Sequence, residues 1–116
     1  MGVDEERQED VAAARLAGGV AGYALGVPLD EITQRTRGSK QAAFARQVAM
    51  YLCHVGFELS LAKVASAFGR DRSTVAHACH QIEDRRDDRE FDRWIASLEA
   101  AVRGAPLRSA RRLARA

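Results

Sequence analysis

The chain has 116 residues, which is enough for one domain and not two, and 47% of them are hydrophobic. The formal net charge is only +2, no stretch approaches the roughly 20 apolar residues of a membrane span, and the acidic start is unlike that of a signal peptide. We therefore expect no membrane segment and, with only Cys53 and Cys79 present, no disulfide framework but a reduced, cytoplasmic protein.

The N-terminal region is predicted to be an acidic tail followed by a helix. Residues 1–10 carry a formal charge of −4 and are expected to be dispensable for the core. From about Glu9 to Leu25 the apolar residues follow a helical period. Three glycines weaken this helix by up to about 1 kcal/mol each relative to alanine, which close packing against a neighbouring helix would explain. These glycines are Gly18, Gly19 and Gly22.

Two further helices are predicted before residue 57. Gly26 is a typical C-terminal stop, and Pro28 can open a short helix that runs through Ile32. A polar, basic loop follows over residues 33–41, and the next helix spans about residues 41–55, with Gly56 ending it. Its apolar face consists of Phe44, Val48, Leu52 and Val55.

Residues 59–82 are predicted to form two helices joined by a tight turn. Ser60 is a good N-cap for the first helix, Gly69 closes it, and Asp71 or Ser73 can cap the second. The apolar face of the first consists of Leu61, Val64, Ala65 and Phe68, and that of the second of Val75, Cys79 and Ile82. Such a pair of helices, with small polar residues opening the second, is typical of a helix-turn-helix that presents side chains to the major groove of DNA.

A sixth helix is predicted from about Asp88 to Arg103. Its apolar face consists of Phe91, Ile95, Leu98 and Val102. The charged run over residues 83–90 is interpreted as a solvated helix surface or hinge with i,i+4 ion pairs. No strand pattern competes, so the fold is predicted to be all-α, with about six helices over residues 11–103 and a basic tail over residues 104–116.

Positive charge is concentrated around the helix-turn-helix. Residues 33–80 contain seven basic and two acidic residues, which give this segment a formal charge of +5, and the C-terminal tail adds four arginines. A locally basic segment of this kind is the electrostatic signature expected for contact with DNA phosphates. The tail is open to three interpretations, namely a basic arm on DNA, an amphipathic segment for a partner, and disorder.

Other site chemistries are disfavoured by residue spacing. The residues that suggest a zinc site are Cys53, His54, His77, Cys79 and His80. Structural zinc ligands usually pair about two to four residues apart in each half of a site, and on a helix Cys79 points inward while the histidines point outward. Ser73, His77 and Asp71 suggest a hydrolase triad, but no nucleophile elbow or oxyanion loop accompanies them. We expect no metal, cofactor, catalytic residue or small-molecule substrate.

Several motifs together resemble one family. They are Arg46-Gln47-Val48-Ala49-Met50-Tyr51-Leu52, Leu59-Ser60-Leu61, Ala67-Phe68-Gly69-Arg70-Asp71, Ser73-Thr74-Val75-Ala76-His77-Ala78-Cys79 and Ile82-Glu83. With residues 20–23 and 27–32, they are similar to the C-terminal DNA-binding domain of the bacterial chromosomal replication initiator DnaA. The resemblance covers roughly residues 20–86 and implies the same helical fold.

The resemblance also implies roles for individual residues. Four residues at the start of the second helix are expected to contact base edges in the major groove, namely Asp71, Arg72, Ser73 and Thr74. Arg35 or Arg37 in the basic loop is expected in the adjacent minor groove, and both remain candidates because this loop is longer than in the family. The candidates for phosphate contact are Lys40, Arg46, Gln47, His54, Lys63, Arg70 and His77. His54 and Gln81 stand where the family has phosphate-binding lysines.

Departures from the family pattern bear on the target site. The turn has only Gly69 where the family usually has two glycines, Arg72 replaces the base-reading histidine, and Ser73 replaces a threonine. An arginine that faces a base prefers guanine through bidentate hydrogen bonds, which provide about 1–3 kcal/mol of discrimination. We therefore expect a preferred site other than the initiator's own box. The sequence also lacks a GxxxxGK[ST] phosphate loop, so we expect no ATP-driven origin melting by this chain alone.

Three functions remain open from the sequence. The first is a sequence-specific transcription regulator, since a free-standing domain of this type resembles activators of phage-derived gene clusters, including gene transfer agents, in alphaproteobacteria. The second is a replication modulator that binds initiator boxes or origin DNA. The third is a protein-interaction adaptor, against which the basic loop, the Arg46-Gln47 pair and the Ser73-Thr74 pair argue. Expected partners are double-stranded DNA in the nucleoid, a protein at the promoter such as RNA polymerase, and a second copy of the chain.

Overall fold

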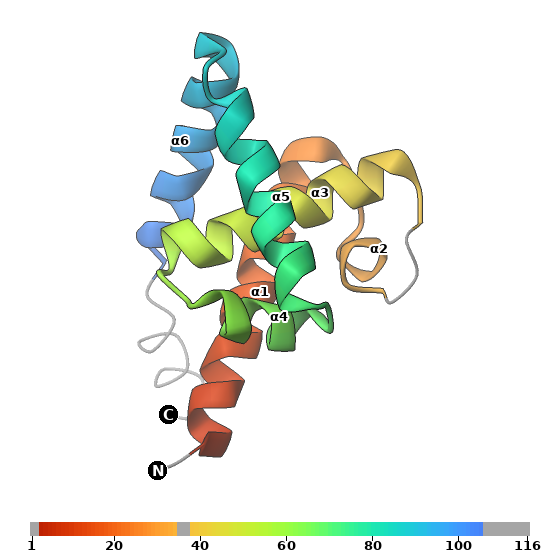
Figure 1. Cartoon of the computed structure of the whole chain (residues 1–116), viewed down its shortest axis with the longest axis vertical. Coiled ribbons are helices and arrows are strands. Elements are labelled where there is room, and N and C mark those ends of the chain that lie inside the picture. The colour runs from red at the N-terminus through yellow and green to blue at the C-terminus, as the bar shows by residue number, and fades with distance from the viewer. Residues whose placement is uncertain (1–2, 35–37, 106–116) are drawn as a thin grey trace.

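Seven helical segments make up the described part of the chain. The computed structural model describes residues 3–34 and 38–105, without the side chains of Val3 and Asp4. The segments are α1 (Val3–Leu25), α2 (Leu29–Thr33), α3 (Lys40–Tyr51), the π-helical turn η1 (Leu52–Gly56), α4 (Leu61–Phe68), α5 (Arg72–Arg85) and α6 (Arg89–Arg103). The predicted all-α fold is confirmed. Figure 1 shows α5 crossing α3 near the centre, with α6 beside α5 and α2 on the other side of the molecule.

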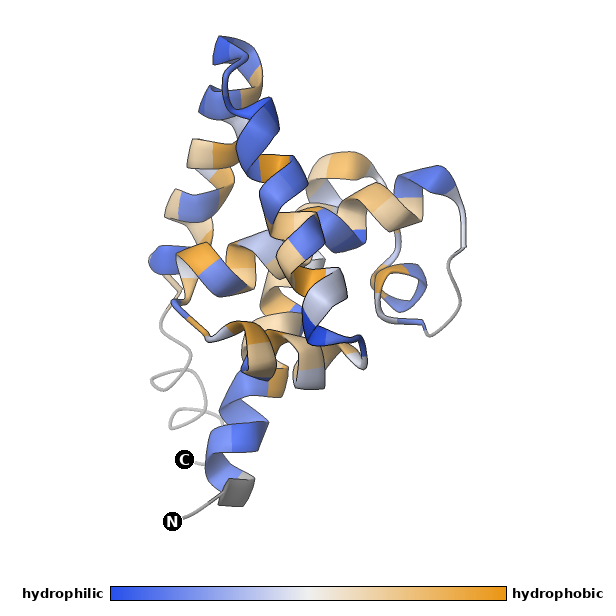
Figure 2. Cartoon of the chain, viewed as in Figure 1, coloured by the Kyte–Doolittle hydropathy of each residue, from blue (hydrophilic) through white to orange (hydrophobic). Residues whose placement is uncertain are grey.

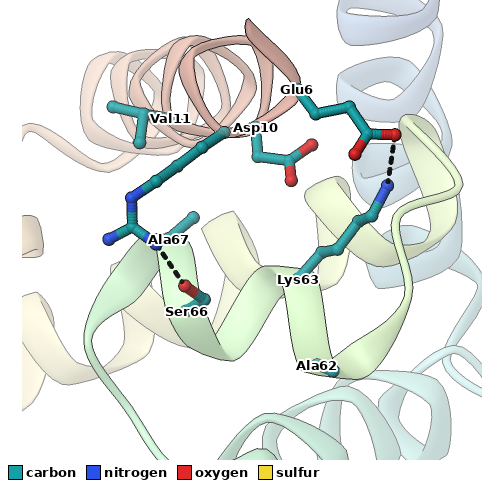
Figure 3. Close-up of a pocket in the computed structure, with 8 residues that line it drawn as sticks. Glu6, Asp10, Val11, Ala62, Lys63, Ser66 and Ala67 are labelled. Atoms are coloured by element: carbon teal, nitrogen blue, oxygen red, sulfur yellow. Dashed lines mark hydrogen bonds and ion pairs between the residues drawn. The ribbon is translucent and has the colours of Figure 1, made fainter. Parts of the chain in front are cut away.

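Helix α1 begins at Val3, earlier than the expected start near Glu9. Its first turns extend beyond the body of the domain and lie beside α4 (Figure 1). Arg7 Nη1 donates a hydrogen bond to Ser66 Oγ over 3.1 Å, and the Glu6 carboxylate lies 3.9 Å from Lys63 Nζ. Figure 3 shows these side chains across a groove of about 260 Å³ between α1 and α4. The contacts with α4, together with acidic residues near the helix N-terminus, favour the longer helix.

The glycines of α1 divide into two kinds. A Cβ on Gly22 would lie 2.3 Å from the Val27 carbonyl oxygen, and one on Gly18 would lie 2.7 Å from Leu29 Cδ1. At Gly19 a Cβ would meet nothing within 4 Å. The close packing expected from the sequence is therefore present at two of the three glycines, where α1 meets the chain leading into α2.

The hydrophobic core lies between α1, α3 and α5, with α4, α6 and η1 closing it. The members of the predicted apolar faces that are fully buried include Val48, Leu52, Val64, Val75, Ile82, Ile95 and Val102. Burying a side chain of this size stabilises the fold by roughly 1.5–3 kcal/mol. Figure 2 shows that hydrophilic residues gather in the first turns of α1 and around the α5–α6 connection. The predicted inward faces of α3, α4, α5 and α6 are confirmed.

The end of α3 differs from the prediction in its geometry. The α-helix stops at Tyr51, and a π-helical turn continues to Gly56, where the Phe57 N–H donates to the Leu52 carbonyl over 3.2 Å. A Cβ on Gly56 would lie 2.5 Å from Val102 Cγ2. The predicted stop at Gly56 is therefore confirmed, and the turn before it lets α6 approach closely.

The two cysteines are free thiols within the helical core. Cys53 is fully buried, whereas Cys79 is partly buried. Burial raises the pKa of Cys53 to about 12 and that of Cys79 to about 11. Both thiols are therefore protonated and inert near neutral pH. Among residues 3–34 and 38–105, no helix combines the length and apolarity needed to cross a membrane.

Candidate nucleic-acid interface

A glycine in the left-handed region sets the turn between α4 and α5. Gly69 has a φ of +63°, its N–H donates to the Ser66 carbonyl over 3.3 Å, and the Arg70 N–H donates to the Ala65 carbonyl over 2.9 Å. This pair of bonds is a Schellman motif, which satisfies the last carbonyls of α4 and reverses the chain direction. The turn therefore fixes where α5 begins relative to α4.

The four predicted base-reading residues lie together at the start of α5. Asp71 occupies the N-cap with an extended backbone, and its side chain makes no capping hydrogen bond. Arg72, Ser73 and Thr74 form the first turn, and all four residues are exposed. The first amides of a helix lack partners within it and carry partial positive charge, so this end of α5 favours an anion such as a DNA phosphate.

The remainder of α5 is held firmly against the domain. Val75, Ala78 and Ile82 are buried beneath it. On its flank, Gln47 Nε2 donates to Gln81 Oε1 over 2.9 Å, which links α3 to α5. The helix is thus supported along one face, while the face that carries Ser73 and His77 is left exposed.

A polar network ties the C-terminal end of α5 to α3 and α6. Arg86 Nη1 donates to the Tyr51 hydroxyl over 2.9 Å and to Glu99 Oε1 over 2.7 Å, and Arg86 Nε donates to Asp92 Oδ1 over 2.6 Å. The Tyr51 hydroxyl in turn donates to Glu83 Oε2 over 2.6 Å. Burial and the bond to Glu83 raise the pKa of Tyr51 to about 12, so it stays neutral and serves as a donor.

Residues 83–90 fit the predicted solvated surface or hinge, since all of them except Arg86 are exposed and the segment joins α5 to α6. His80, which precedes the run, lies 3.5 Å from Asp84 at i,i+4. Arg86 instead points between helices, and the Arg85 guanidinium lies over the Phe91 ring at 4.2 Å from its centroid. Sequence reasoning missed the contacts of both arginines because their partners lie on α3 and α6, outside the charged run itself.

Arg46, predicted to contact phosphate, is turned into the domain. It is 5% exposed, its Nε donates to the Ile32 carbonyl over 2.7 Å, and one Nη donates to the Glu31 carbonyl over 3.0 Å. These carbonyls belong to the last turn of α2, where a cation is favoured by the helix dipole. Its phosphate contact stays a prediction, and its structural role is to fasten α2 to α3.

Arg70 is also engaged with backbone carbonyls. One Nη donates to the Gln34 carbonyl over 2.7 Å and the other donates to the Phe68 carbonyl over 3.1 Å. Burial and the nearby Arg70 guanidinium lower the pKa of Arg46, because the charged form is disfavoured both by desolvation and by a neighbouring cation. The carbonyls around them offset this repulsion, and Gln34 is a participant that sequence reasoning missed.

The remaining candidates are distributed over several surfaces. Lys40 is exposed at the start of α3, and His77 is exposed on α5. His54 is partly buried, with Nδ1 at 2.7 Å from the Leu59 carbonyl oxygen. Lys63 lies in the α1–α4 groove beside Glu6 (Figure 3). Arg35 and Arg37 lie outside the described residues.

The structure therefore assembles a smaller site than the sequence predicts. It brings together residues 71–74 at the start of α5, His77 one turn along the same helix, and Arg70, which contacts the end of α2. His54 and Lys63 are engaged elsewhere in the fold. Within the described residues, no three His, Cys, Asp or Glu side chains are grouped so that they could hold a metal ion.

Comparisons with known proteins agree on one family. A family model described as the bacterial dnaA protein helix-turn-helix matches residues 20–82. The chromosomal replication initiator proteins DnaA of Caldanaerobacter subterraneus subsp. tengcongensis and Thermodesulfovibrio yellowstonii are 35% and 36% identical over 79 and 83 residues. These matches cover 67% and 70% of this chain but 18% and 19% of the relatives, so the chain spans about a fifth of their length.

Solved structures of replication initiators share the fold. A crystal structure of a DNA replication initiation factor has a TM-score of 0.77 at 27% identity, and the match covers 88% of this chain and 32% of that one. A replication initiator DnaA bound to AMPPCP and single-stranded DNA has a TM-score of 0.74 at 26% identity, covering 88% and 31%. The family model spans more than half of the residues and includes α4, the turn and α5 up to Ile82, so the chain belongs to the bacterial DnaA helix-turn-helix family and is a DNA-binding domain of that type.

Proposed function

We propose that this chain binds double-stranded DNA at specific sequences, with the start of α5 in the major groove. The observation that carries the proposal is the cluster of four exposed polar residues, residues 71–74, at the N-terminus of a helix whose other face is buried. Side chains at this position of a helix-turn-helix reach base edges, while nearby amides and cations contact phosphates.

The base preference is proposed to depend on Arg72. Its guanidinium has the donor geometry for guanine O6 and N7, and it is exposed at the first position of α5. Selection from a random duplex library is expected to enrich sites with guanine at the position that faces Arg72. Arg72→Ala should then lose about 1–3 kcal/mol of discrimination at that position.

Lys40 provides a matched control for this experiment. It is another exposed cation, at the start of α3, and is proposed to contact phosphate. Lys40→Ala should weaken binding to all sequences about equally and lower the slope of log K against log salt by about one. The role assigned to Arg72 is wrong if Arg72→Ala behaves in the same way as Lys40→Ala.

We infer regulation of transcription as the cellular role, including activation of phage-derived or gene-transfer-agent genes. This inference is supported by Arg72, which stands where the family has a base-reading histidine and so favours a DNA target other than the initiator's box. Replication modulation is a second candidate, favoured because the matched relatives are named replication initiators. Enrichment of the initiator's box in the selection supports replication, whereas a different motif supports transcription.

The proposed setting is the nucleoid, with help from a second contact. One domain of this size buries a modest area on DNA, so a second copy of the chain or a protein at the promoter would raise its affinity. Analytical ultracentrifugation of the protein on a selected duplex tests the first arrangement. One protein per site at saturating concentration would exclude the homodimer.

A further inference from the structure

The first turns of α1 lie along the outward face of α4, which is the first helix of the helix-turn-helix (Figure 3). The exposed residues of α4 are Ala62, Lys63 and Ser66, and all of them line the α1–α4 groove. The opposite side of α4 is buried in the core through residues 64, 65 and 68. The surface that α4 could offer to a DNA backbone is therefore the surface that faces α1.

Two side-chain contacts hold the first turns of α1 in this position. Arg7 Nη1 donates to Ser66 Oγ over 3.1 Å, and the Glu6 carboxylate lies 3.9 Å from Lys63 Nζ. Glu6 and Arg7 are neighbours in α1, while Lys63 and Ser66 are one turn apart on α4, so the two contacts fix one helix beside the other. The ammonium of Lys63 thus already has an anionic partner within the chain.

The start of α1 also brings negative charge next to the helix-turn-helix. Residues 5–10 contain four acidic residues and one arginine, which give a formal charge of −3. The side chains of Glu6 and Lys63 are 70% and 45% exposed, so their ion pair is open to solvent. Such a pair is weak and is screened by salt, so a DNA phosphate can replace the Glu6 carboxylate at Lys63.

We propose that the first turns of α1 are an autoinhibitory segment, in which Glu6 competes with DNA phosphate for Lys63. This inference rests on the proposed DNA binding and adds its regulation. When DNA binds, Lys63 has to leave Glu6 to reach a phosphate, and the acidic turns stay beside a polyanion. Both effects lower the affinity for every sequence about equally, because a phosphate contact carries no base preference.

The first test determines, without DNA, whether these contacts hold α1 on α4. Limited trypsin digestion is followed by mass spectrometry, and cleavage after Arg7 is compared with cleavage after Arg15, the next basic residue of α1. The double variant Glu6→Gln and Ser66→Ala should raise this ratio by about three- to tenfold, because the end of the helix then opens more often.

The matched control is the double variant Glu5→Gln and Ser97→Ala. Glu5 is exposed in the same turn as Glu6 but does not line the α1–α4 groove, and Ser97 is an exposed serine of α6. The control therefore makes the same chemical changes away from the groove and should leave the ratio unchanged. Equal ratios in the two double variants would overturn the proposal.

The second test measures binding to a selected DNA duplex by fluorescence anisotropy over a range of salt concentrations. Glu6→Gln should tighten binding by about two- to fivefold at low salt and steepen the slope of log K against log salt by about one, because Lys63 then neutralises one more phosphate. Glu5→Gln removes the same charge without freeing Lys63, so it should leave the slope unchanged. In a Lys63→Ala background, Glu6→Gln should no longer change the slope.

The outcomes separate this inference from the proposed function. If the wild type and Glu6→Gln bind the selected duplex with the same affinity and slope, DNA binding stands and autoinhibition by Glu6 is wrong. A gain that persists in the Lys63→Ala background would also overturn the inference, because it would assign the effect to general charge. If neither protein binds any duplex, the proposed function itself fails, while the trypsin ratio still decides whether α1 is held on α4.

Discussion

Replacing Arg86 with alanine tests whether the polar network is a structural element of the domain. The Arg86 side chain is 20% exposed and that of its partner Glu99 is 8% exposed, so the substitution leaves a nearly buried carboxylate. Removing one member of a buried ion pair costs about 3–5 kcal/mol. Arg103 still lies 3.7 Å from Glu99, and Asp92 is 47% exposed, which reduces the loss. We expect Arg86→Ala to lower the free energy of unfolding by about 2–4 kcal/mol. This is a large part of the roughly 5–15 kcal/mol that is typical of a domain.

The assay is urea unfolding followed by far-ultraviolet circular dichroism and by the fluorescence of the single tryptophan. Trp94 is a suitable probe because its ring lies 5.6 Å from that of Phe91 and 6.3 Å from that of Phe44, between α3 and α6. The double variant Arg86→Ala and Glu99→Ala should lose less free energy of unfolding than the two single variants together. The difference should be about 1 kcal/mol or more, because the two side chains interact directly.

Two results would refute this reasoning. If Arg86→Ala lowered the free energy of unfolding by less than about 0.5 kcal/mol, the ion pairs of Arg86 would contribute no more than exposed ion pairs do. Weaker DNA binding by the folded variant would mean that the network does more than hold the helix, since it lies at the end of α5 opposite the base-reading residues.

Three further predictions address packing, backbone geometry and pH. Gly22→Ala should destabilise the domain, since its Cβ would lie 2.3 Å from the Val27 carbonyl oxygen, whereas Gly19→Ala, in open space, should stabilise it by up to about 1 kcal/mol; thermal melting compares the two, and equal effects would contradict the packing described. Gly69→Ala should cost about 1 kcal/mol in urea unfolding because alanine disfavours a φ of +63°, and an unchanged midpoint would count against the strained turn. The pKa of Cys53 is about 12 in the folded protein against an ordinary 9.0, so folding favours the protonated thiol. The contribution of this thiol to the free energy of unfolding is therefore complete below pH 9 and is lost as the pH rises towards 12. Urea midpoints should fall over this range, and less steeply in Cys53→Ala; an equal slope would show that the thiol is not responsible.

The helices and their buried faces could be predicted from the sequence because their signals are local. Gly69 and Ser60 mark the ends of α4, and the spacing of apolar residues along α5 and α6 identifies the sides that face the core. The candidate base-reading residues come from the family resemblance at the turn, and their role stays a prediction.

The roles of the arginines could not be predicted, because a sequence shows charge but not direction. The phosphate contacts of Arg46 and Arg70 stay predictions, but the sequence does not show that Arg46 bonds a carbonyl 14 positions away and Arg70 one 36 positions away. Arg86 lay in a run of charges that resembled a solvated surface, while its partners Tyr51 and Glu99 lie on other helices. Tertiary contacts of this range leave no periodic signal for sequence reasoning to detect.

The π-helical turn at residues 52–56 is a place where the chain can tolerate a change of length. Its backbone closes on an i→i+5 hydrogen bond, so it holds one residue more than the α-helical turn that it replaces. Deleting one residue here would restore i→i+4 bonding and keep the direction of the helix. Deleting one residue inside α3 would instead rotate the residues after it by about 100° relative to those before it, which would break up the buried face that includes Val48. Relatives should therefore differ in length by one residue more readily in this turn than inside α3.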